Sequence, residues 1–344
     1  MLYILIPLGI LALTVLWFIQ YGGPRLPKNI NQLIEEVKNE PLPELMTGEK
    51  DFVENDGIRL CYEVIKPQGT PKGTVLLVHG LSSTLLDWPR HFFQPFLEED
   101  YQVIRYDNRS LGESDWIQKT WKDNKYTLED LARDGMAILD KLGIEKAHIV
   151  GVSMGGMISQ RMAISHSERV LSLTSIMSTG FFDDSKLPQV PRPFLIGFTR
   201  AILLYGRDLT NMDNKLKLHL SIRKLLVGKG YSTDDKYILQ KAYYENTRRK
   251  GYNATAREHH SYAIKKSGSR YNELAQINVP TLVIHGTKDT LVPFPHGEKY
   301  APMIPNVEKL FLKDMGHDLP KEYSGQMTAA ILKNFAKANE SVKV

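Results

Sequence analysis

The stretch Ile149-Val150-Gly151-Val152-Ser153-Met154-Gly155-Gly156-Met157 is an apolar run, followed by a serine near glycines, followed by the start of a helical pattern. A serine hydroxyl is a good nucleophile only when a base takes its proton and a sharp strand-to-helix turn presents it. Gly151 and Gly155 remove the clashes that bulky neighbours would make at such a turn. The stretch therefore predicts a strand, a nucleophile at Ser153 and a helix from Met154.

Apolar runs of the same kind occur on both sides of this stretch. Residues 74–78 precede His79-Gly80, and residues 103–106 precede Asp107. Such runs are typical of strands that are buried on both faces of a parallel sheet. Helical patterns alternate with them, which predicts an α/β fold with helices on both faces of the sheet. The other predicted elements are a β-hairpin at 51–54 and 58–65, strands at 147–150, 170–177, 281–285 and 307–312, and helices at 88–97, 128–142, 154–166 and 322–338.

Residues 181–270 interrupt this alternation with a mostly helical pattern. They contain 18 Lys and Arg against 8 Asp and Glu, whereas the whole chain has a net charge of only +5. We predict a basic helical lid whose surface is either simply solvated or attracts an anionic lipid or an anionic substrate. No nucleic-acid-binding module accompanies the charge, so we expect no nucleic-acid partner.

The N-terminal residues form a separate segment. From Met1 to Ile19 the sequence carries no charge, and about 19 residues at 1.5 Å each would span about 28 Å, close to the hydrocarbon thickness of a bilayer. No positive leader and no small-residue cleavage site precede Pro24, which argues against a cleaved signal peptide. We predict a single-pass membrane anchor at 1–21 and a tether at 22–50. The nearest cations follow the span, which favours a cytoplasmic catalytic domain.

Three residues with the chemistry of a hydrolytic triad, Ser153, Asp289 and His317, follow predicted strands. Ligands of open parallel sheets gather at the carboxyl ends of the strands, where these residues would meet. Their order along the chain is that of the α/β-hydrolase triad and differs from the order in other serine hydrolase folds. The sequence therefore resembles an α/β-hydrolase over about residues 50 to 340, with the basic segment in the place of the family's lid.

A narrower similarity connects residues 151–160, 171–179 and 315–320 to the aclacinomycin methylesterase-like branch of this superfamily. The resemblance implies an α/β-hydrolase fold with an eight-stranded, mostly parallel sheet, whose core comprises residues 51–180 and 271–344.

The resemblance also implies acyl transfer in two steps. His317 would take the proton of Ser153, Asp289 would hold the imidazole, and water would hydrolyse the acyl-enzyme. The oxyanion hole would consist of the backbone N–H groups of Leu81 and Met154.

Other residues are open to more than one interpretation. Asp183 or Asp184, which follow the preceding core strand, could replace Asp289 as the acid. The pair His259-His260 in the lid either contacts substrate or lies on the surface. We interpret His79 as a structural residue that shapes the oxyanion loop.

The remaining candidates are interpreted as structural. His148, His285 and the single cysteine, Cys61, are interpreted as packing residues because each lies in a strand pattern. Residues 107–114 resemble a family loop that buttresses the site. No cluster supports metal ligation, and no cofactor is expected.

A serine at position 153 excludes the branches of the superfamily that use aspartate or cysteine as nucleophile. We expect a serine hydrolase that acts on a small-molecule or lipid-like ester. A monoacylglycerol-type lipase, a carbon–carbon bond hydrolase and a cofactor-free perhydrolase would use the same triad. A ligand-binding receptor with little turnover and a membrane scaffold are alternatives of a different class. The sequence does not indicate an oligomeric state.

Overall fold

The protein is described by a computed structural model that covers residues 18, 22–118, 120, 122 and 125–341. Its centre is an eight-stranded sheet with the strand order β1-β2-β4-β3-β5-β6-β7-β8. The hairpin partners β1 and β2 are antiparallel, β2 pairs antiparallel with β4, and the other pairings are parallel. The predicted architecture is confirmed. The strands are β1 (Glu49–Asn55), β2 (Ile58–Ile65), β3 (Gly73–Val78), β4 (Tyr101–Tyr106), β5 (Ala147–Val152), β6 (Val170–Ile176), β7 (Thr281–Gly286) and β8 (Glu308–Leu312).

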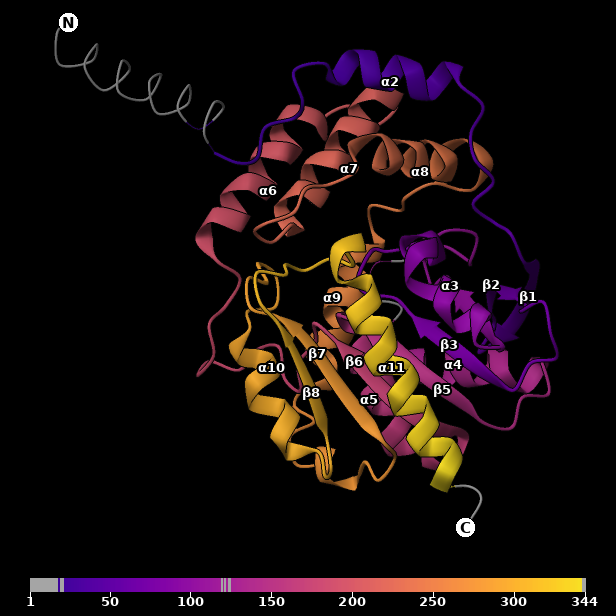
Figure 1. Ribbon diagram of the computed structural model, residues 1–344. Coiled ribbons are helices and arrows are strands. Elements are labelled where there is room, and N and C mark those ends of the chain that lie inside the picture. The colour runs from indigo at the N-terminus through magenta and orange to yellow at the C-terminus, as the bar shows by residue number, and fades with distance from the viewer. Residues whose placement is uncertain (1–17, 19–21, 119, 121, 123–124, 342–344) are drawn as a thin grey trace, which may run out of the picture.

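Both faces of the sheet are covered by helices, which explains why the central strands are apolar throughout. Along β3, Leu76 and Val78 join the core under α4 and α5, whereas Val75 and Leu77 join the core under α3 and α11. Figure 1 shows α3 and α11 on the near side of the sheet. The covering helices are α3 (Arg90–Glu98), α4 (Leu128–Lys141), α5 (Met154–Ser165), α10 (Pro295–Tyr300) and α11 (Lys321–Ser341).

Four helices separate β6 from β7 and form the lid. In Figure 1, α6, α7 and α8 lie together beyond one end of the sheet, and α9 lies closer to it. The lid helices are α6 (Arg192–Tyr205), α7 (Met212–Leu226), α8 (Asp235–Arg248) and α9 (Ala256–Ser267). Short 3₁₀ segments complete the fold: η1 (Leu85–Asp87), η2 (Ser167–Arg169), η3 (Leu274–Gln276) and η4 (Ala301–Met303).

The segment predicted as a tether contributes a helix, α2 (Ile30–Asn39), to the packing of the lid. Ile34 and Val37 on α2 are buried in one cluster with Leu216 and Leu220 of α7 and Leu239 of α8. This helix lies along α7 and α8 in Figure 1. Residues 30–39 therefore belong structurally to the lid.

The predicted membrane location requires a correction. Among the residues that the structure describes, no helix has both the length and the apolar composition needed to cross a bilayer. The single-pass anchor, and the cytoplasmic placement that depended on it, are therefore unsupported. Residues 1–21, to which the anchor was assigned, lie outside the described residues except for Phe18.

Candidate active site

Ser153 lies on a sharp turn between β5 and α5. Its backbone angles, φ 58° and ψ −122°, belong to a region that side chains other than glycine rarely occupy. The turn brings backbones so close that a Cβ on Gly151 would collide with the carbonyl oxygen of Gly155, and one on Gly155 with that of Val78. The Ser153 side chain makes no capping hydrogen bond to α5. The hydroxyl is therefore not occupied in capping the helix.

The turn that follows β3 lies against Ser153. A Cβ on Gly80 would be 3.0 Å from the Ser153 Cβ and 3.4 Å from its Oγ. Leu81 follows Gly80 directly, and Met154 is the first residue of α5, a position whose N–H has no partner within the helix. The two predicted oxyanion-hole residues are thus the chain neighbours of Gly80 and Ser153, which lie against each other.

Asp289, after β7, and His317, after β8, form a buried pair. The Asp289 Oδ2 atom lies 2.7 Å from Nδ1 of His317, and its Oδ1 accepts the N–H groups of Leu291 and Val292 at 2.8 Å each. A carboxylate only accepts hydrogen bonds, so Nδ1 of His317 carries a hydrogen, and Nε2 is the nitrogen that can accept a proton when the ring is neutral.

The environment of Asp289 favours its ionised form. Burial by itself would raise the pKa of Asp289, but its interactions with His317 and His285 hold that pKa well below its ordinary value. His285 Nε2 donates to the carbonyl of Val292 at 2.8 Å and lies 3.4 Å from Asp289 Oδ2. Sequence reasoning assigned His285 to packing alone, because nothing in a strand pattern indicates a contact with a carboxylate four residues later.

The alternative acids have other surroundings. Asp184 accepts a hydrogen bond from Tyr271 at 2.9 Å and pairs with Lys299, while Asp183 is exposed. The contact to His317 is made by Asp289.

The lid histidines His259 and His260 are 2% and 0% exposed, so their interpretation as surface residues is wrong. Nε2 of His260 lies 3.0 Å from the carbonyl oxygen of Arg109, to which it must donate. Nδ1 is therefore an acceptor, and it receives the N–H of Ser82 at 3.4 Å. Burial lowers the pKa of His260 to about 4, which keeps the ring neutral. A lid residue thus supports the turn after β3.

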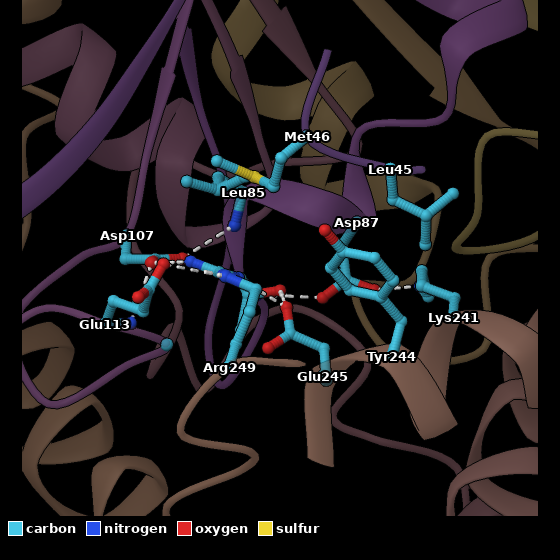
Figure 2. Close-up of polar contacts among 12 residues, drawn as sticks. Leu45, Met46, Leu85, Asp87, Asp107, Glu113, Lys241, Tyr244, Glu245 and Arg249 are labelled. Atoms are coloured by element: carbon cyan, nitrogen blue, oxygen red, sulfur yellow. Dashed lines mark hydrogen bonds and ion pairs between the residues drawn. The ribbon is translucent and has the colours of Figure 1, made fainter. Parts of the chain in front are cut away.

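Ion pairs connect the lid to the loops around this turn (Figure 2). Asp87, in η1, binds both Arg223 of α7 and Lys241 of α8. Arg249, just after α8, binds Asp107 and lies 2.6 Å from Glu245.

Two acids of this network, Glu245 and Asp107, also accept hydrogen bonds from the segment that follows β3. The hydroxyl of Thr84 donates to Glu245, and Asp107 accepts the N–H of Leu85 at 2.9 Å. Asn108 donates to the carbonyl of His79 at 3.1 Å. The loop after β4 therefore contacts both the segment that follows β3 and the lid. The lid residues in the network were missed, because charges so distant in the sequence carry no signal of their pairing.

The surroundings of His79 and Cys61 agree with their interpretation as structural residues, and the shaping of an oxyanion loop by His79 stays a prediction. The His79 ring packs edge-on against Trp88 at 5.2 Å, and burial lowers its pKa to about 3. Cys61 is buried. Within the described part of the chain, no three His, Cys, Asp or Glu residues are grouped so as to hold a metal ion.

The sheet order, the strained turn after β5 and the helical insertion after β6 define the class of α/β-fold hydrolases. Residues 73–322 match the α/β hydrolase fold family, and the chain belongs to that family. The chain is 29% identical to the rhodomycin D methylesterase DauP of Streptomyces sp. (strain C5), over 75% of this chain and 89% of DauP. The expected resemblance to methylesterase-like hydrolases is thereby confirmed.

Two further comparisons agree with this assignment. The chain is 30% identical to the 2-hydroxy-6-oxononadienedioate/2-hydroxy-6-oxononatrienedioate hydrolase of Paraburkholderia phymatum, over 77% of this chain and 87% of that one. The meta-cleavage product hydrolase of Pseudomonas fluorescens IP01 shares the fold with a TM-score of 0.66 at 20% identity. That match covers 86% of this chain and all of the other. The protein is a hydrolase of the α/β-hydrolase family.

Proposed function

We propose that the protein is a serine hydrolase that cleaves carboxylic esters through an acyl-enzyme. The observation that carries this proposal is the buried 2.7 Å hydrogen bond between Asp289 and His317. It orients a histidine whose free Nε2 can act as a base, in a fold that presents Ser153 on a strained turn.

The proposed reaction has two halves. Ser153 Oγ attacks the ester carbonyl carbon while His317 Nε2 takes its proton, and the resulting tetrahedral intermediate expels the alcohol, which receives that proton. Water then attacks the acyl group with His317 again as base, which releases the acid and restores the serine. The N–H groups of Leu81 and Met154 would stabilise both oxyanions, and one such donor contributes about 3–4 kcal/mol. Asp289 stays ionised throughout and stabilises the imidazolium.

The ester class is supported by the similarity to DauP, which is named as a methylesterase. We propose a small-molecule or lipid-like ester as substrate. A second candidate is hydrolysis of a carbon–carbon bond in a 2-hydroxy-6-oxo dienoate. It is favoured by the 30% identity to the Paraburkholderia hydrolase whose name contains that compound class.

A fluorophosphonate probe and a substrate panel test these proposals together. The wild-type protein should be labelled and should hydrolyse short or medium acyl esters, and Ser153→Ala should lose both while it remains folded. Hydrolysis of a 2-hydroxy-6-oxo dienoate in preference to every ester would select the second candidate. Labelling without turnover of any panel compound would favour a ligand-binding receptor, and the absence of both labelling and turnover would refute the serine hydrolase.

Two matched variants test the acid. Asp289→Asn should lower kcat by up to about 10⁴-fold, because an amide stabilises the wrong histidine tautomer. Asp184→Asn, which changes an aspartate bound to Lys299, should leave kcat within about threefold, since substitutions remote from the reacting groups have small effects. The opposite result would move the acid to Asp184.

A further inference from the structure

The end of the lid helix α7 and the connection from α7 to α8 (residues 227–234) lie directly on the two loops that carry Asp289 and His317. The N–H of His317 donates to the carbonyl of Leu226 at 2.8 Å, and the N–H of Lys229 donates to that of Asp314 at 2.7 Å. The hydroxyl of Thr290 donates to the carbonyl of Leu225 at 2.8 Å. One short segment of the lid is therefore bonded to both loops.

No side chain separates the connection from the histidine loop. A Cβ on Gly228 would collide with the backbone of Asp314 and Gly316, and a Cβ on Gly316 would collide with the carbonyl of Leu226. The two backbones can approach so closely because both positions are glycine. A movement of the connection would therefore be transmitted to the residues next to His317.

Tyr231, within this connection, reaches the histidine loop with its hydroxyl group. The oxygen accepts the N–H of Gly228 and the N–H of Gly316, each at 2.9 Å. The hydroxyl hydrogen goes to Oδ1 of Asp318. A phenol offers one donor and two acceptor positions, so all three are used. Two of the three bonds are made to the residues immediately before and after His317.

The hydrogen-bond count also fixes the direction of the contact with Asp318. Because two N–H groups donate to the Tyr231 oxygen, its hydrogen must point to the carboxylate. Burial raises the pKa of Asp318 to about 6, while the bond from Tyr231 and the nearby His317 act in the opposite direction. The hydroxyl of Tyr231 thus stabilises a half-buried carboxylate beside the candidate base.

We propose that Tyr231 of the lid is a positioning residue for His317, which it acts on through Gly316 and Asp318. This inference rests on the proposed function, because His317 needs exact placement only if it transfers a proton between Ser153 and the substrate. Tyr231 contacts none of the reacting atoms. Its hydroxyl binds the backbone N–H of Gly316 before the base and the side-chain carboxylate of Asp318 after it, and Asp289 binds the ring.

The test compares Tyr231→Phe with Tyr323→Phe in the full-length protein. Tyr323 is a matched control, because its ring packs against Tyr231 at 5.7 Å. Its own hydroxyl donates to the carbonyl of Lys313 at 2.7 Å, outside residues 316–318. Hydrogen–deuterium exchange of the peptide spanning residues 314–319 reports on the loop without any need for turnover. The rate of fluorophosphonate labelling and the steady-state constants report on catalysis.

Tyr231→Phe should accelerate exchange in the 314–319 peptide, because the Gly316 N–H loses its acceptor. It should also lower kcat and the labelling rate about tenfold or more, since small misplacements of a reacting group are costly. KM should change by less than about twofold, because uniform substrate binding is not affected. Tyr323→Phe should match the wild-type protein in all three measurements.

Three results would overturn the proposal. The first is unchanged exchange in Tyr231→Phe, and the second is faster exchange with labelling and kcat at the wild-type level. The third is a rise in KM alone, which would indicate a role in binding. If the wild-type protein is not labelled at all, the proposed function fails and takes the catalytic role of Tyr231 with it. The exchange data would then show separately whether the hydroxyl holds the loop.

Discussion

Ser153 occupies a backbone conformation that favours glycine. A non-glycine residue with φ 58° and ψ −122° is strained, and such strain costs on the order of 1–3 kcal/mol. Gly151 and Gly155 are present where backbones touch, yet the residue between them that most needs a glycine is a serine. The strain is tolerated at the position of the proposed nucleophile.

The strain can be measured with a pair of variants. Ser153→Gly and Ser153→Ala should both abolish hydrolysis, because each removes the hydroxyl. Only glycine relieves the backbone strain, and this gain exceeds the roughly 0.5–1 kcal/mol that glycine costs through the unfolded chain. Ser153→Gly should therefore be about 1 kcal/mol more stable than Ser153→Ala in urea unfolding. Equal stability would limit the strain to the roughly 0.5–1 kcal/mol that glycine costs, and a more stable alanine variant would show that the turn stores less strain than that.

Among the elements, the sheet was the part that the sequence predicted best. Strands such as β3 are buried on both faces and are therefore apolar without interruption, so the local pattern alone identifies them. Helix α3 begins at Arg90 instead of residue 88, because Pro89 disfavours a helical conformation at Trp88. The packing of α2 could not be predicted, because its buried residues meet partners on α7 and α8 that lie far away in the sequence.

Some residues of the candidate site could likewise be predicted from the sequence, and others could not. Ser153 and His317 belong to short motifs that are visible in the sequence, and Asp289 follows a strand. Tyr231, which binds the loop of His317, and Glu245, which accepts a hydrogen bond from Thr84, both come from the lid, and these contacts are recognisable only once the lid is folded. Part of the lid's positive charge was also misjudged from the sequence. Cations such as Arg249 point inward to buried acids and do not lie on a solvated surface.

The ion pairs of Arg249 should contribute strongly to the stability of the protein. Arg249→Met should destabilise the protein by about 3–5 kcal/mol, because it leaves Asp107 and Glu245 buried without their cation. The neighbouring Arg248→Met changes an exposed residue and should cost less than about 0.5 kcal/mol. Urea unfolding at pH 7 measures both changes in the free energy of unfolding. Similar values for the two variants would mean that the buried pairs do not fasten the lid.

For the whole molecule, buried titratable groups make the free energy of unfolding depend on pH in opposing directions. Burial lowers the pKa of His79 to about 3 and that of His260 to about 4, so the stability they contribute is lost as pH falls below about 6.5. Burial raises the pKa of Glu245 to about 7, with Arg249 opposing the shift and Asp107 adding to it. The folded protein therefore binds this proton more tightly than the unfolded chain. The stability linked to Glu245 is complete below about pH 4.5 and is lost as pH rises through 7.

Replacing Glu245 by glutamine isolates this contribution from that of the histidines. The amide cannot titrate, so the free energy of unfolding of Glu245→Gln should decline less than that of the wild type between pH 4.5 and 8. The expected difference is on the order of 1–3 kcal/mol. Glu258→Gln makes the same substitution at an exposed position of the lid and should reproduce the wild-type curve. Urea unfolding at a series of pH values measures all three proteins. A Glu245→Gln curve parallel to the wild type would show that Glu245 is ionised in the folded protein throughout this range, and that its pairing with Arg249 outweighs the effect of burial.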